Sequence, residues 1–581
     1  MFLERSISAK LLLAGALLVT ACGPSMELPQ SDPDNGGLFL PDGFAALVVA
    51  DSIGPARHLA VRENGDVYVK LRFSHKGFGN VALRDTSGDG RADIIQRFGD
   101  VEPRRAGYGT GMLIHDGYLY FSTELNVYRM KLAPNALVPT DSAELVLEDD
   151  HDHGVHWHIT KPVAFDDKGY MYVPFGTPSN ACQDIGQTPN GAPGGTGLDP
   201  CPELELHGGI WRFKADKTGL RQRDGVRITT GLRSIVAMRW NPGDKGLYVV
   251  MHGRDNLHSL FPDRFTAWQN AMLPAEELIR VTDGEDYGWP YCYYDQMQDK
   301  KVLAPEYGGD GKTVGRCAEM NLPLMGFPGH WAPNDLLFYR GNQFPDRYRN
   351  GAFIAFHGST NRGPYPQAGY FVAFVPFENG KPNGQFEVFA DGFAGVDTIV
   401  NTQDAQHRPV GLAEGPDGSL YITESRRGKL WRVMFTGDRK NFGADQLRSM
   451  EARKELAHIR TPDEIEDDLQ RHLPRQVRLY NTFCGTCHQR DGRGVRGRMP
   501  PLRDSEWVYG NKQRLIAAVL NGLQGPLTVN GEQYNSVMPS LGYLSDEDIA
   551  VILTYVRREF GNSASAVSAD EVAMLRSSQT R

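Results

Sequence analysis

The sequence predicts a mainly β protein: a six-bladed β-propeller followed by a small all-α domain. It contains 65 Gly and 36 Pro among 581 residues, which favours many tight turns and therefore β-structure. A turn rich in Asp, Asn and Gly, followed by an apolar-aromatic strand, recurs through the first 435 residues, and its tyrosines Tyr68, Tyr120 and Tyr172 are spaced by 52 residues. Imperfect copies of one such unit are typical of a propeller. Because the period is irregular, a pair of β-sandwiches is the alternative.

The predicted propeller occupies residues 39–436, and each blade is expected to be a small antiparallel sheet closed against its neighbours. The later copies lie further apart, which indicates insertions. The six copies are ENGDVYVK (63–70), HDGYLYFS (115–122), DDKGYMYV (166–173), GDKGLYVVM (243–251), NGAFIAFHGS (350–359) and PDGSLYITES (416–425).

Size and charge limit the class of protein. A chain of 581 residues is too long for one hydrophobic core, so two or more domains are expected. The net charge of −9 offers no basic surface for nucleic acid. A small neutral or cationic partner therefore fits the composition better.

The first 22 residues have the features of a bacterial lipoprotein signal peptide. Arg5 and Lys10 precede the apolar run LLLAGALLV at 11–19, which is too short to cross a bilayer but has the length of a signal-peptide core. The run continues through VTAC to Cys22 and resembles a lipobox, in which the cysteine carries the lipid; a plain secretory signal is the alternative. We therefore expect an exported, periplasmic protein, anchored to the membrane through Cys22, with residues 23–38 as a tether.

Four of the seven cysteines are predicted to form two disulfide bonds. Setting aside Cys22 and a CxxCH pair leaves four cysteines, which an oxidising compartment would pair. Sequence alone allows three pairings. We favour the local pairs because each brackets a Gly/Pro-rich loop: Cys182 with Cys201, and Cys292 with Cys317.

The pattern changes after the propeller. Residues 437–474 are polar and charged without strand signals, which predicts a linker with some helix. Residues 475–562 are predicted to be helical: NKQRLIAAVLNGL has helical spacing, and SDEDIAVILTYVRREFGN opens with a Ser-x-x-Asp capping box. Residues 563–581 are predicted to be a disordered tail.

The stretch FCGTCHQRDGRG, residues 483–494, contains a CxxCH motif. Cys484 and Cys487 can add to the two vinyl groups of haem, and His488 then lies under the iron as the proximal ligand. A zinc site and a redox-active CxxC are the competing interpretations. The sequence has no second Cys/His pair nearby and no thioredoxin-like βαβ pattern, so we favour covalently bound haem c.

The sixth iron ligand is expected to be a thioether or imidazole about 50 residues later. Met538, in NSVMPSLGYLSDEDIA, lies just before the final helix of the domain. Met499, in GRMPPL, is only 11 residues beyond His488 and is expected to pack on the haem edge. The region resembles class I cytochromes c over its whole length, including the Pro-Pro-Leu after CxxCH and the closing helix DIAVILTYVRREFGN. The resemblance implies a cytochrome c domain.

The propeller carries a series of motifs in a definite order. From about residue 40 to 435 they resemble the pyrroloquinoline-quinone (PQQ) dependent soluble aldose (glucose) and sorbosone dehydrogenases. The motifs are HITKPVAFDDKGYMYV, GLRSIVAMRWNP, MHGRDNLH, DYGWPYCYYD, FHGSTNR and HRPVGLAEGPDGSLYITES.

This resemblance implies a catalytic base and a cradle of arginines. His158 matches the general base that takes the hydroxyl proton as hydride passes to the quinone, and His156 is the alternative. Arg233, Arg362 and Arg408 match positions beside the cofactor. Guanidinium groups suit PQQ because it has three carboxylates.

The resemblance also implies Ca²⁺ beside PQQ, held by the backbone carbonyls of Gly253 and Arg254 in HGRD. Four positions depart from the pattern of the soluble glucose dehydrogenases. An Asp expected nineteen residues after the base is Thr177, and other expected side chains are replaced at Ser234, Asn361 and Gln406. These departures favour the sorbosone-dehydrogenase-like branch.

A second calcium site is suggested by RDTSGDGRAD, residues 84–93. Asp85, Asp89 and Asp93 fit the early positions of a calcium loop, but Gln96 stands where the loop normally ends in Glu. The alternative is a plain Asp/Gly turn between two strands. A metal bound there would be structural.

Together these features predict a periplasmic quinohaemoprotein oxidoreductase. It would oxidise a sugar, alcohol or aldehyde with PQQ and Ca²⁺ and pass electrons one at a time through haem c to a respiratory acceptor. A calcium-dependent lactonase-like propeller and a non-catalytic propeller tethered to an electron-transfer cytochrome are the alternatives. A carboxylate-rich calcium site on the propeller axis would favour the lactonase.

Overall fold

The computed structural model describes residues 28–99, 109–151, 158–183, 191–463, 473–496, 499–535, 538, 540–542 and 544–579. The signal peptide, Cys22, the start of the tether and His156 therefore lie outside the described residues, and the predictions of export and lipid anchoring stay predictions. Within the described ranges, no helix is both long and apolar enough to cross a membrane.

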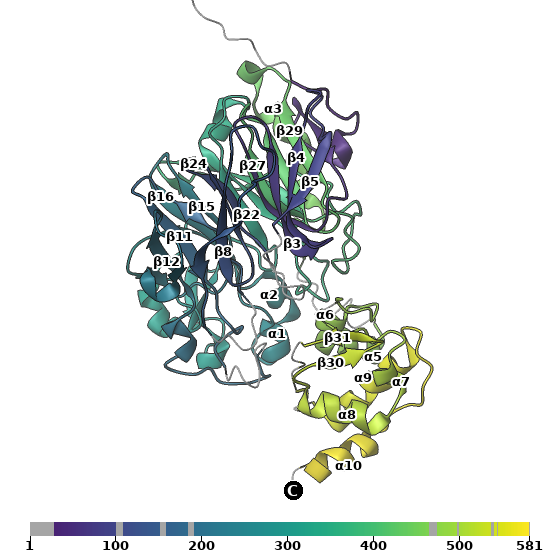
Figure 1. Cartoon of the computed structure of the whole chain (residues 1–581). Coiled ribbons are helices and arrows are strands. Elements are labelled where there is room, and N and C mark those ends of the chain that lie inside the picture. Colours follow the sequence, from purple (N-terminus) through teal and green to yellow (C-terminus); the bar gives the residue numbers. More distant parts are fainter. Residues whose placement is uncertain are drawn as a thin grey trace, which may run out of the picture.

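Six mainly antiparallel sheets form the predicted propeller (Figure 1). In blade order, from the first to the fourth strand, they are β2 (Ala56–Val61), β3 (Val67–His75), β4 (Phe78–Arg84), β5 (Ile94–Phe98); β6 (Met112–His115), β7 (Tyr118–Ser122), β8 (Asn126–Lys131), β9 (Glu144–Glu148); β10 (Ala164–Phe165), β11 (Tyr170–Phe175), β12 (Gly209–Lys214), β14 (Val226–Thr230); β15 (Ile235–Asn241), β16 (Gly246–Met251), β17 (Glu276–Val281), β21 (Met325–Phe327); β22 (Pro333–Phe338), β23 (Gly351–Phe356), β24 (Phe371–Glu378), β26 (Glu387–Ala390); and β27 (Pro409–Glu414), β28 (Leu420–Glu424), β29 (Leu430–Phe435), β1 (Phe44–Ala50).

The first strands of the blades form the ring around the axis. β2 contacts β6 and β27, β15 contacts β10 and β22, and β22 contacts β27. The second strands are covered by neighbouring blades on both faces. This explains why β16 and β23 are buried at every residue and are almost continuously apolar.

The ring is closed by strands from the two ends of the propeller sequence. β1 pairs antiparallel with β29, Phe44 lying opposite Phe435. Phe44 also packs edge-on against Phe344, Phe389 and Phe435, with ring centroids 4.8 to 5.1 Å apart. The first strand therefore completes the sixth blade and leaves its sheet without an open edge at this point.

Blade geometry places two sets of loops at one end of the propeller. The first strand of each blade starts at the end where the second strand finishes, because consecutive strands are antiparallel. Residues just before β10, β15, β22 and β27 therefore meet residues just after β11, β16, β23 and β28. This end is called the central face below.

Insertions surround the central face beside the third and fourth blades. They contain the helices α1 (Leu257–Leu260) and α2 (Ala267–Met272) and the hairpin of β19 (Cys292–Asp295) and β20 (Lys300–Leu303). The short strands β13 (Leu220–Arg221), β18 (Glu285–Asp286) and β25 (Lys381–Pro382) extend individual blades.

The described part of the predicted linker is packed against the propeller. It forms α3 (Ala444–Ala452), and both Met450 and Ile459 are buried in the core that β23 and β24 also line. Arg453 and His458 contact the buried Asp391 at 2.5 and 2.9 Å. The sequence prediction identified the charged character of this segment but missed its two apolar anchors.

The C-terminal domain is helical, as predicted. Its helices are α5 (Arg475–Phe483), α6 (Gly485–His488), α7 (Glu506–Tyr509), α8 (Lys512–Asn521) and α9 (Asp546–Arg558), with a hairpin of β30 (Leu527–Val529) and β31 (Glu532–Tyr534). Ser545 caps α9 by accepting from the Asp548 amide at 3.1 Å. The rings of Tyr480 on α5 and Tyr555 on α9 lie 5.3 Å apart and fasten the two helices together.

The predicted disordered tail is wrong for residues 569–579, which form α10 (Ala569–Gln579). Val567 and Val572 are buried with residues of α8 and α9, and Lys512 pairs with Glu571 at 2.7 Å. The apolar spacing was present in the sequence, but it was too sparse to be recognised as a packed helix.

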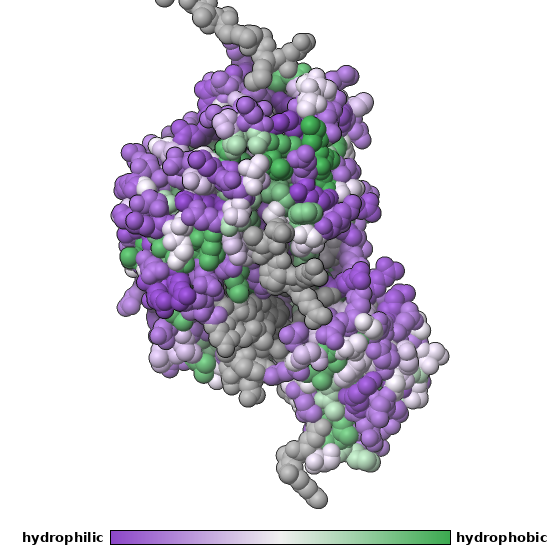
Figure 2. Space-filling view, viewed as in Figure 1, coloured by the Kyte–Doolittle hydropathy of each residue, from purple (hydrophilic) through white to green (hydrophobic). Residues whose placement is uncertain are grey.

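Hydrophilic side chains cover most of the face seen in Figure 2. Apolar side chains gather mainly in the upper part of this view, over the sheets of the propeller. This distribution agrees with the 23% charged residues of an ordinary globular protein.

Candidate functional site

The central face gathers most of the chemistry-bearing residues that the sequence singled out. His158, Arg233 and Arg408 precede the first strands of the third, fourth and sixth blades, and Arg362 follows the second strand of the fifth. A continuous chain of contacts starts at His158 and reaches Thr177, Arg233 and Asp255. The predicted base and one predicted arginine therefore belong to one network.

His158 is held as a neutral imidazole. Its Nδ1 lies 2.7 Å from the Thr177 carbonyl oxygen and 3.1 Å from the Thr177 hydroxyl. A carbonyl can only accept, so Nδ1 carries the proton and Nε2 is left unprotonated. Burial, followed by the nearby Arg233, lowers the pKa of His158 well below its usual value. The side chain is thus ready to accept a proton at Nε2.

Arg233 is almost fully buried and anchored from three sides. Its guanidinium donates to the Gly253 carbonyl at 2.7 Å, to the Asn180 side chain at 3.0 Å and to Asp255 at 2.9 Å. Its Nε is buried and has no partner among the described residues. The Arg233 carbonyl accepts from the Thr177 amide at 3.0 Å, which ties the arginine to the segment that orients His158.

Arg362 is a buried cation with little neutralisation. The side chain is 1% exposed, its Nε donates to the Ala271 carbonyl at 3.1 Å, and its Nη1 has no partner within the described part of the chain. Burial lowers the pKa of Arg362 to about 10. A guanidinium in this state is suited to an anionic partner.

Arg408 forms a further cationic corner. It donates to the His357 carbonyl at 3.1 Å, lies 2.9 Å from His357 Nδ1, and donates to the Gly358 carbonyl. His357 Nε2 lies 2.6 Å from the Ser425 hydroxyl. Burial, followed by Arg408 and Arg57, lowers the pKa of His357 well below its usual value, so this imidazole is neutral.

The residues present fit a planar ligand with several carboxylates. Guanidinium nitrogens of Arg233 and Arg362 are buried without partners among the described residues. Leaving such donors unpaired is costly, and a carboxylate would satisfy them. The donor set is therefore consistent with PQQ.

The structure offers a less complete site for Ca²⁺ at HGRD. The Gly253 carbonyl already accepts from Arg233, although a carbonyl oxygen has a second lone pair. The Arg254 side chain turns away to pair with the buried Glu306. Glu276, whose pKa burial raises to about 7, accepts from the Gly253 amide at 2.9 Å. Ca²⁺ at the carbonyls of Gly253 and Arg254 therefore stays a prediction.

The second predicted calcium site is a hairpin turn between β4 and β5. Asp85 accepts from the amides of Gly88 and Gly90, each at 2.7 Å, and Asp93 accepts from the Thr86 amide at 2.6 Å. Among the described residues, which include this whole turn, no three His, Cys, Asp or Glu side chains lie together as a metal site. The structure thus does not bring Asp85, Asp89 and Asp93 together for a metal, and the plain-turn alternative describes them.

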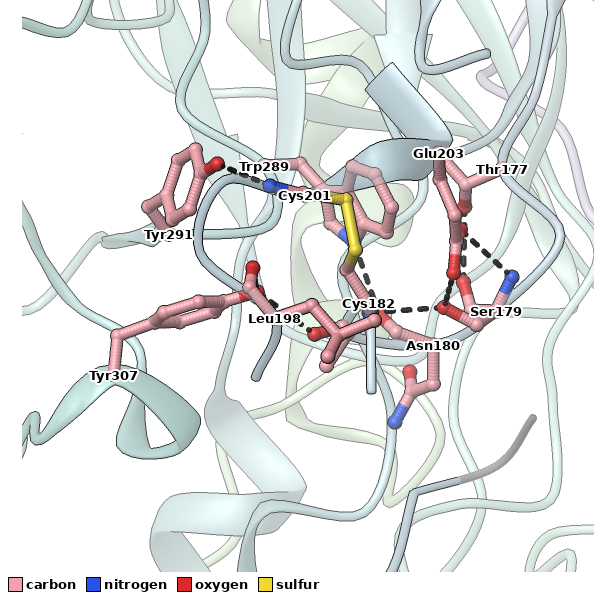
Figure 3. The surroundings of a disulfide bond; sticks show 11 residues. Thr177, Ser179, Asn180, Cys182, Leu198, Cys201, Glu203, Trp289, Tyr291 and Tyr307 are labelled. Atoms are coloured by element: carbon pink, nitrogen blue, oxygen red, sulfur yellow. Dashed lines mark hydrogen bonds between the residues drawn. A yellow bond between two sulfur atoms is a disulfide. The ribbon is translucent and has the colours of Figure 1, made fainter. Parts of the chain in front are cut away.

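Both predicted disulfide bonds are confirmed: Cys182 with Cys201, and Cys292 with Cys317. Figure 3 shows the first of them beside Thr177 and Asn180, which lie on the same segment as Cys182. The Trp289 indole donates to the Asn180 carbonyl at 3.0 Å, and the Tyr291 hydroxyl accepts from the Cys201 amide at 2.8 Å. The braced loops therefore support the residues that hold His158 and Arg233.

Sequence reasoning missed several residues of the central face. Asn180 accepts from both Arg233 and the Asp255 amide, and His330 Nδ1 lies 3.3 Å from Asp255. The HGRD motif contains Asp255 in plain view. Asn180 and His330 lie outside short recognisable motifs, and only the fold brings them to the site.

The haem motif has the geometry expected of a proximal ligand. His488 is buried, and its Nδ1 lies 2.8 Å from the Pro500 carbonyl, which leaves Nε2 for the iron. Cys484 and Cys487 are free thiols. Met538 forms an isolated β-bridge with Leu523 and packs beside the core of α8 and α9, whereas Met499 bridges to Val495.

One hydrogen bond joins the haem motif to the propeller. The Gln403 side chain, on the loop before β27, donates to the Gly494 carbonyl at 3.4 Å. The Gly494 amide in turn donates to the His488 carbonyl at 2.9 Å. The loop that leads to Arg408 thus touches the loop that follows the proximal histidine.

Comparisons with known proteins match the two parts of the chain separately. A family model described as TrAA12-like matches residues 38–436, and a model described as cytochrome c matches residues 477–558. Cytochrome c-552 of Thermus thermophilus is 37% identical over 102 residues, covering 16% of this chain and 78% of that protein.

An uncharacterised protein of Borreliella burgdorferi is 26% identical over 210 residues, covering 36% of this chain. The match spans about half, 48%, of that relative's length. The cytochrome subunit of fructose dehydrogenase from Gluconobacter japonicus is 35% identical over 106 residues, covering 17% of this chain and 21% of that subunit.

Solved structures share the propeller fold. The PQQ domain of pyranose dehydrogenase from Coprinopsis cinerea gives a TM-score of 0.53 at 17% identity, covering 71% of this chain and 99% of that one. A calcium structure of the family AA12 enzyme from Trichoderma reesei gives 0.54 at 18% identity, covering 69% and 97%. At such identities the likeness establishes the fold. From its matched family models, the chain belongs to the TrAA12-like family over its propeller and carries a cytochrome c domain behind it.

Proposed function

We propose that this protein is an exported, lipid-anchored quinohaemoprotein dehydrogenase that oxidises a sugar, alcohol or aldehyde. The observation that carries the proposal is the pairing of a neutral His158 with the unpaired guanidinium nitrogens of Arg233 and Arg362 on one face. A base and an anion cradle are what oxidation of a hydroxyl group on a carboxylated quinone requires.

Substrate would bind beside His158. The imidazole takes the hydroxyl proton at Nε2, while Thr177 keeps the ring in that tautomer through Nδ1. PQQ, when bound, supplies the carbon that accepts the hydride, and Ca²⁺ at the carbonyls of Gly253 and Arg254 would polarise it. The imidazolium formed at His158 must then release its proton to solvent before the next turnover.

The arginines would hold and orient the cofactor. Arg233, Arg362 and Arg408 come from three different blades, so a flat ligand on the central face would be gripped around its edge. Asn180 and Gly253 already fix the Arg233 guanidinium, so little side-chain entropy remains to be lost on binding.

The cytochrome c domain implies haem c, which would carry the two electrons away one at a time. The contact from Gln403 to Gly494 supports transfer within one chain. The acceptor would be a respiratory cytochrome, oxidase or quinone, and attachment through Cys22 would keep the domain near the membrane. The arginines of the central face favour this proposal over a lactonase, which would need acidic calcium ligands.

The deciding experiment follows the haem spectrum of the purified holo-cytochrome. The protein is loaded with PQQ, with and without Ca²⁺, and offered a panel of sugars, alcohols and aldehydes. We expect haem reduction only with PQQ and a substrate of the panel. Failure of every substrate to reduce the haem, or equal reduction without PQQ, would overturn the proposal.

A further inference from the structure

Asp255 is a carboxylate on the central face that the proposed reaction has not yet used. It is the last residue of HGRD, directly after the second strand of the fourth blade. Its carboxylate contacts Arg233 at 2.9 Å, His330 Nδ1 at 3.3 Å and the Asn361 side-chain amide. The side chain is 27% exposed, whereas that of Arg233 is 4% exposed. Asp255 therefore lies at the surface of the cradle with Arg233 behind it.

The loop geometry fixes Asp255 firmly. Its amide donates to the Asn180 side chain at 2.9 Å, and its carbonyl accepts from the same side chain at 2.9 Å. Burial acts to raise the pKa of Asp255, but Arg233 and then His330 outweigh it and hold the pKa well below its usual range. The residue is therefore an anion throughout the working pH range.

His158 has few compensating negative charges. Its Nδ1 partner is the neutral Thr177. The groups that act on the pKa of His158 besides burial are Arg233 and His252, which lower it, and the Thr177 backbone and Asp255, which raise it. When His158 takes a proton it becomes a cation beside Arg233, and Asp255 is the anion placed to offset that charge.

We propose that Asp255 is a positioning residue for this oxidation: it holds Arg233 through a charged hydrogen bond and supplies the negative charge that offsets the protonated His158 base. This role rests on the proposed function. An anion in a cradle for a tricarboxylate opposes cofactor binding by like-charge repulsion, so its benefit must lie in the reaction step. The two effects have opposite signs, and this allows the role to be tested.

The test compares Asp255→Asn with the unsubstituted full-length protein carrying haem. Asn has nearly the same shape and can still accept from Arg233, but it lacks the charge. The first measurement is PQQ affinity in the absence of substrate, from quenching of tryptophan fluorescence. We expect binding at least as tight as in the unsubstituted protein, because a negative charge has been removed.

The second measurement is the rate of haem reduction, with PQQ saturating, by the most active substrate of the panel. A charge at this distance shifts a base by about one to two pKa units, and about half of that shift reaches the rate. The expected loss is therefore about 3- to 10-fold. Asp255→Glu, which keeps the charge, should recover at least part of the loss.

Asp417→Asn is the matched control. Asp417 also pairs with an arginine, Arg432, at 2.8 Å, but it lies in the β27–β28 turn, at the opposite end of the blade from the central face. It should leave both PQQ affinity and rate unchanged. Haem content and thermal unfolding check that each variant is folded.

Parallel losses of PQQ affinity and rate in Asp255→Asn would show that Asp255 only supports the loop, and would overturn the proposal. An unchanged rate, or a rate restored by raising Ca²⁺ alone, would overturn it as well. If the unsubstituted protein neither binds PQQ nor reduces its haem, the proposed function itself has failed, which is a separate result.

Discussion

The Nδ1 atom of His158 lies 2.7 Å from the carbonyl oxygen of Thr177 and 3.1 Å from the Thr177 hydroxyl. Nineteen residues separate the two in the chain. The related soluble glucose dehydrogenases were expected to have an Asp at the position of Thr177. Here a main-chain oxygen fixes the imidazole instead, and the hydroxyl serves as the weaker second contact.

Replacing His158 by Gln should lower substrate-driven haem reduction by about 10²- to 10⁴-fold, the usual contribution of a general base. Thr177→Val is the matched control. It keeps the main-chain acceptor and removes one neutral hydrogen bond, so the expected loss is less than about tenfold. Stopped-flow spectra of the haem measure both. A loss in Thr177→Val as large as in His158→Gln would assign the orienting role to the hydroxyl.

Acid should destabilise the propeller between about pH 6.5 and 4. Burial lowers the pKa of His252 to about 4, and it also lowers those of His158 and His357. In this window the unfolded chain binds protons that the folded chain excludes, so the free energy of unfolding falls as the pH falls.

Thermal unfolding at a series of pH values, followed by tryptophan fluorescence, measures this effect. His252→Gln should show a shallower decline of the midpoint between pH 6.5 and 4.5 than the unsubstituted protein. Identical slopes would mean that His252 already binds a proton in the folded state.

Replacing Arg362 by Met should weaken PQQ binding by about 10- to 100-fold, since a charged hydrogen bond is removed. The same change should leave the cofactor-free protein as stable as before or more so, because a buried, poorly neutralised cation is lost. Arg239→Met is the contrast. Arg239 pairs with the buried Asp335 at 3.1 Å, so its loss should destabilise the protein strongly. Calorimetry and fluorescence titration with PQQ distinguish the two cases, and equal PQQ affinity in Arg362→Met would remove Arg362 from the cradle.

Met538→Ala should lower the reduction potential of the haem and change its spectrum, because a methionine ligand raises the potential. Met499→Ala should leave the iron ligation intact. Spectroelectrochemical titration of the two variants decides between them. A shift confined to Met499→Ala would exchange the roles assigned to the two methionines.

The sequence was sufficient for the architecture and for the residues of strong motifs. Repeated turn-strand units predicted the propeller, and CxxCH predicted the buried His488. The disulfide pairs followed from local loops. In each case the information lies within a short stretch of chain, where spacing alone limits the geometry.

The remainder depends on contacts between distant segments. Asp255 acquires its role only when Arg233, His330 and Asn361 converge on it from two blades. The anchoring of the linker by Met450 and Ile459, and the packing of α10, likewise depend on surfaces that no local pattern describes. The acidic turn at Asp85 shows the opposite error, since a metal-loop pattern there is satisfied by the turn's own amides.

The pairing of β1 with β29 also determines how the chain can be cut and rejoined. The sixth blade is a clasp made from both ends of the propeller sequence, with Phe44 opposite Phe435. Whatever precedes residue 44 and whatever follows residue 435 therefore start from adjacent strands of one blade. A different leader or a different electron carrier could be attached there without reopening the ring, whereas trimming into β1 would unfasten it.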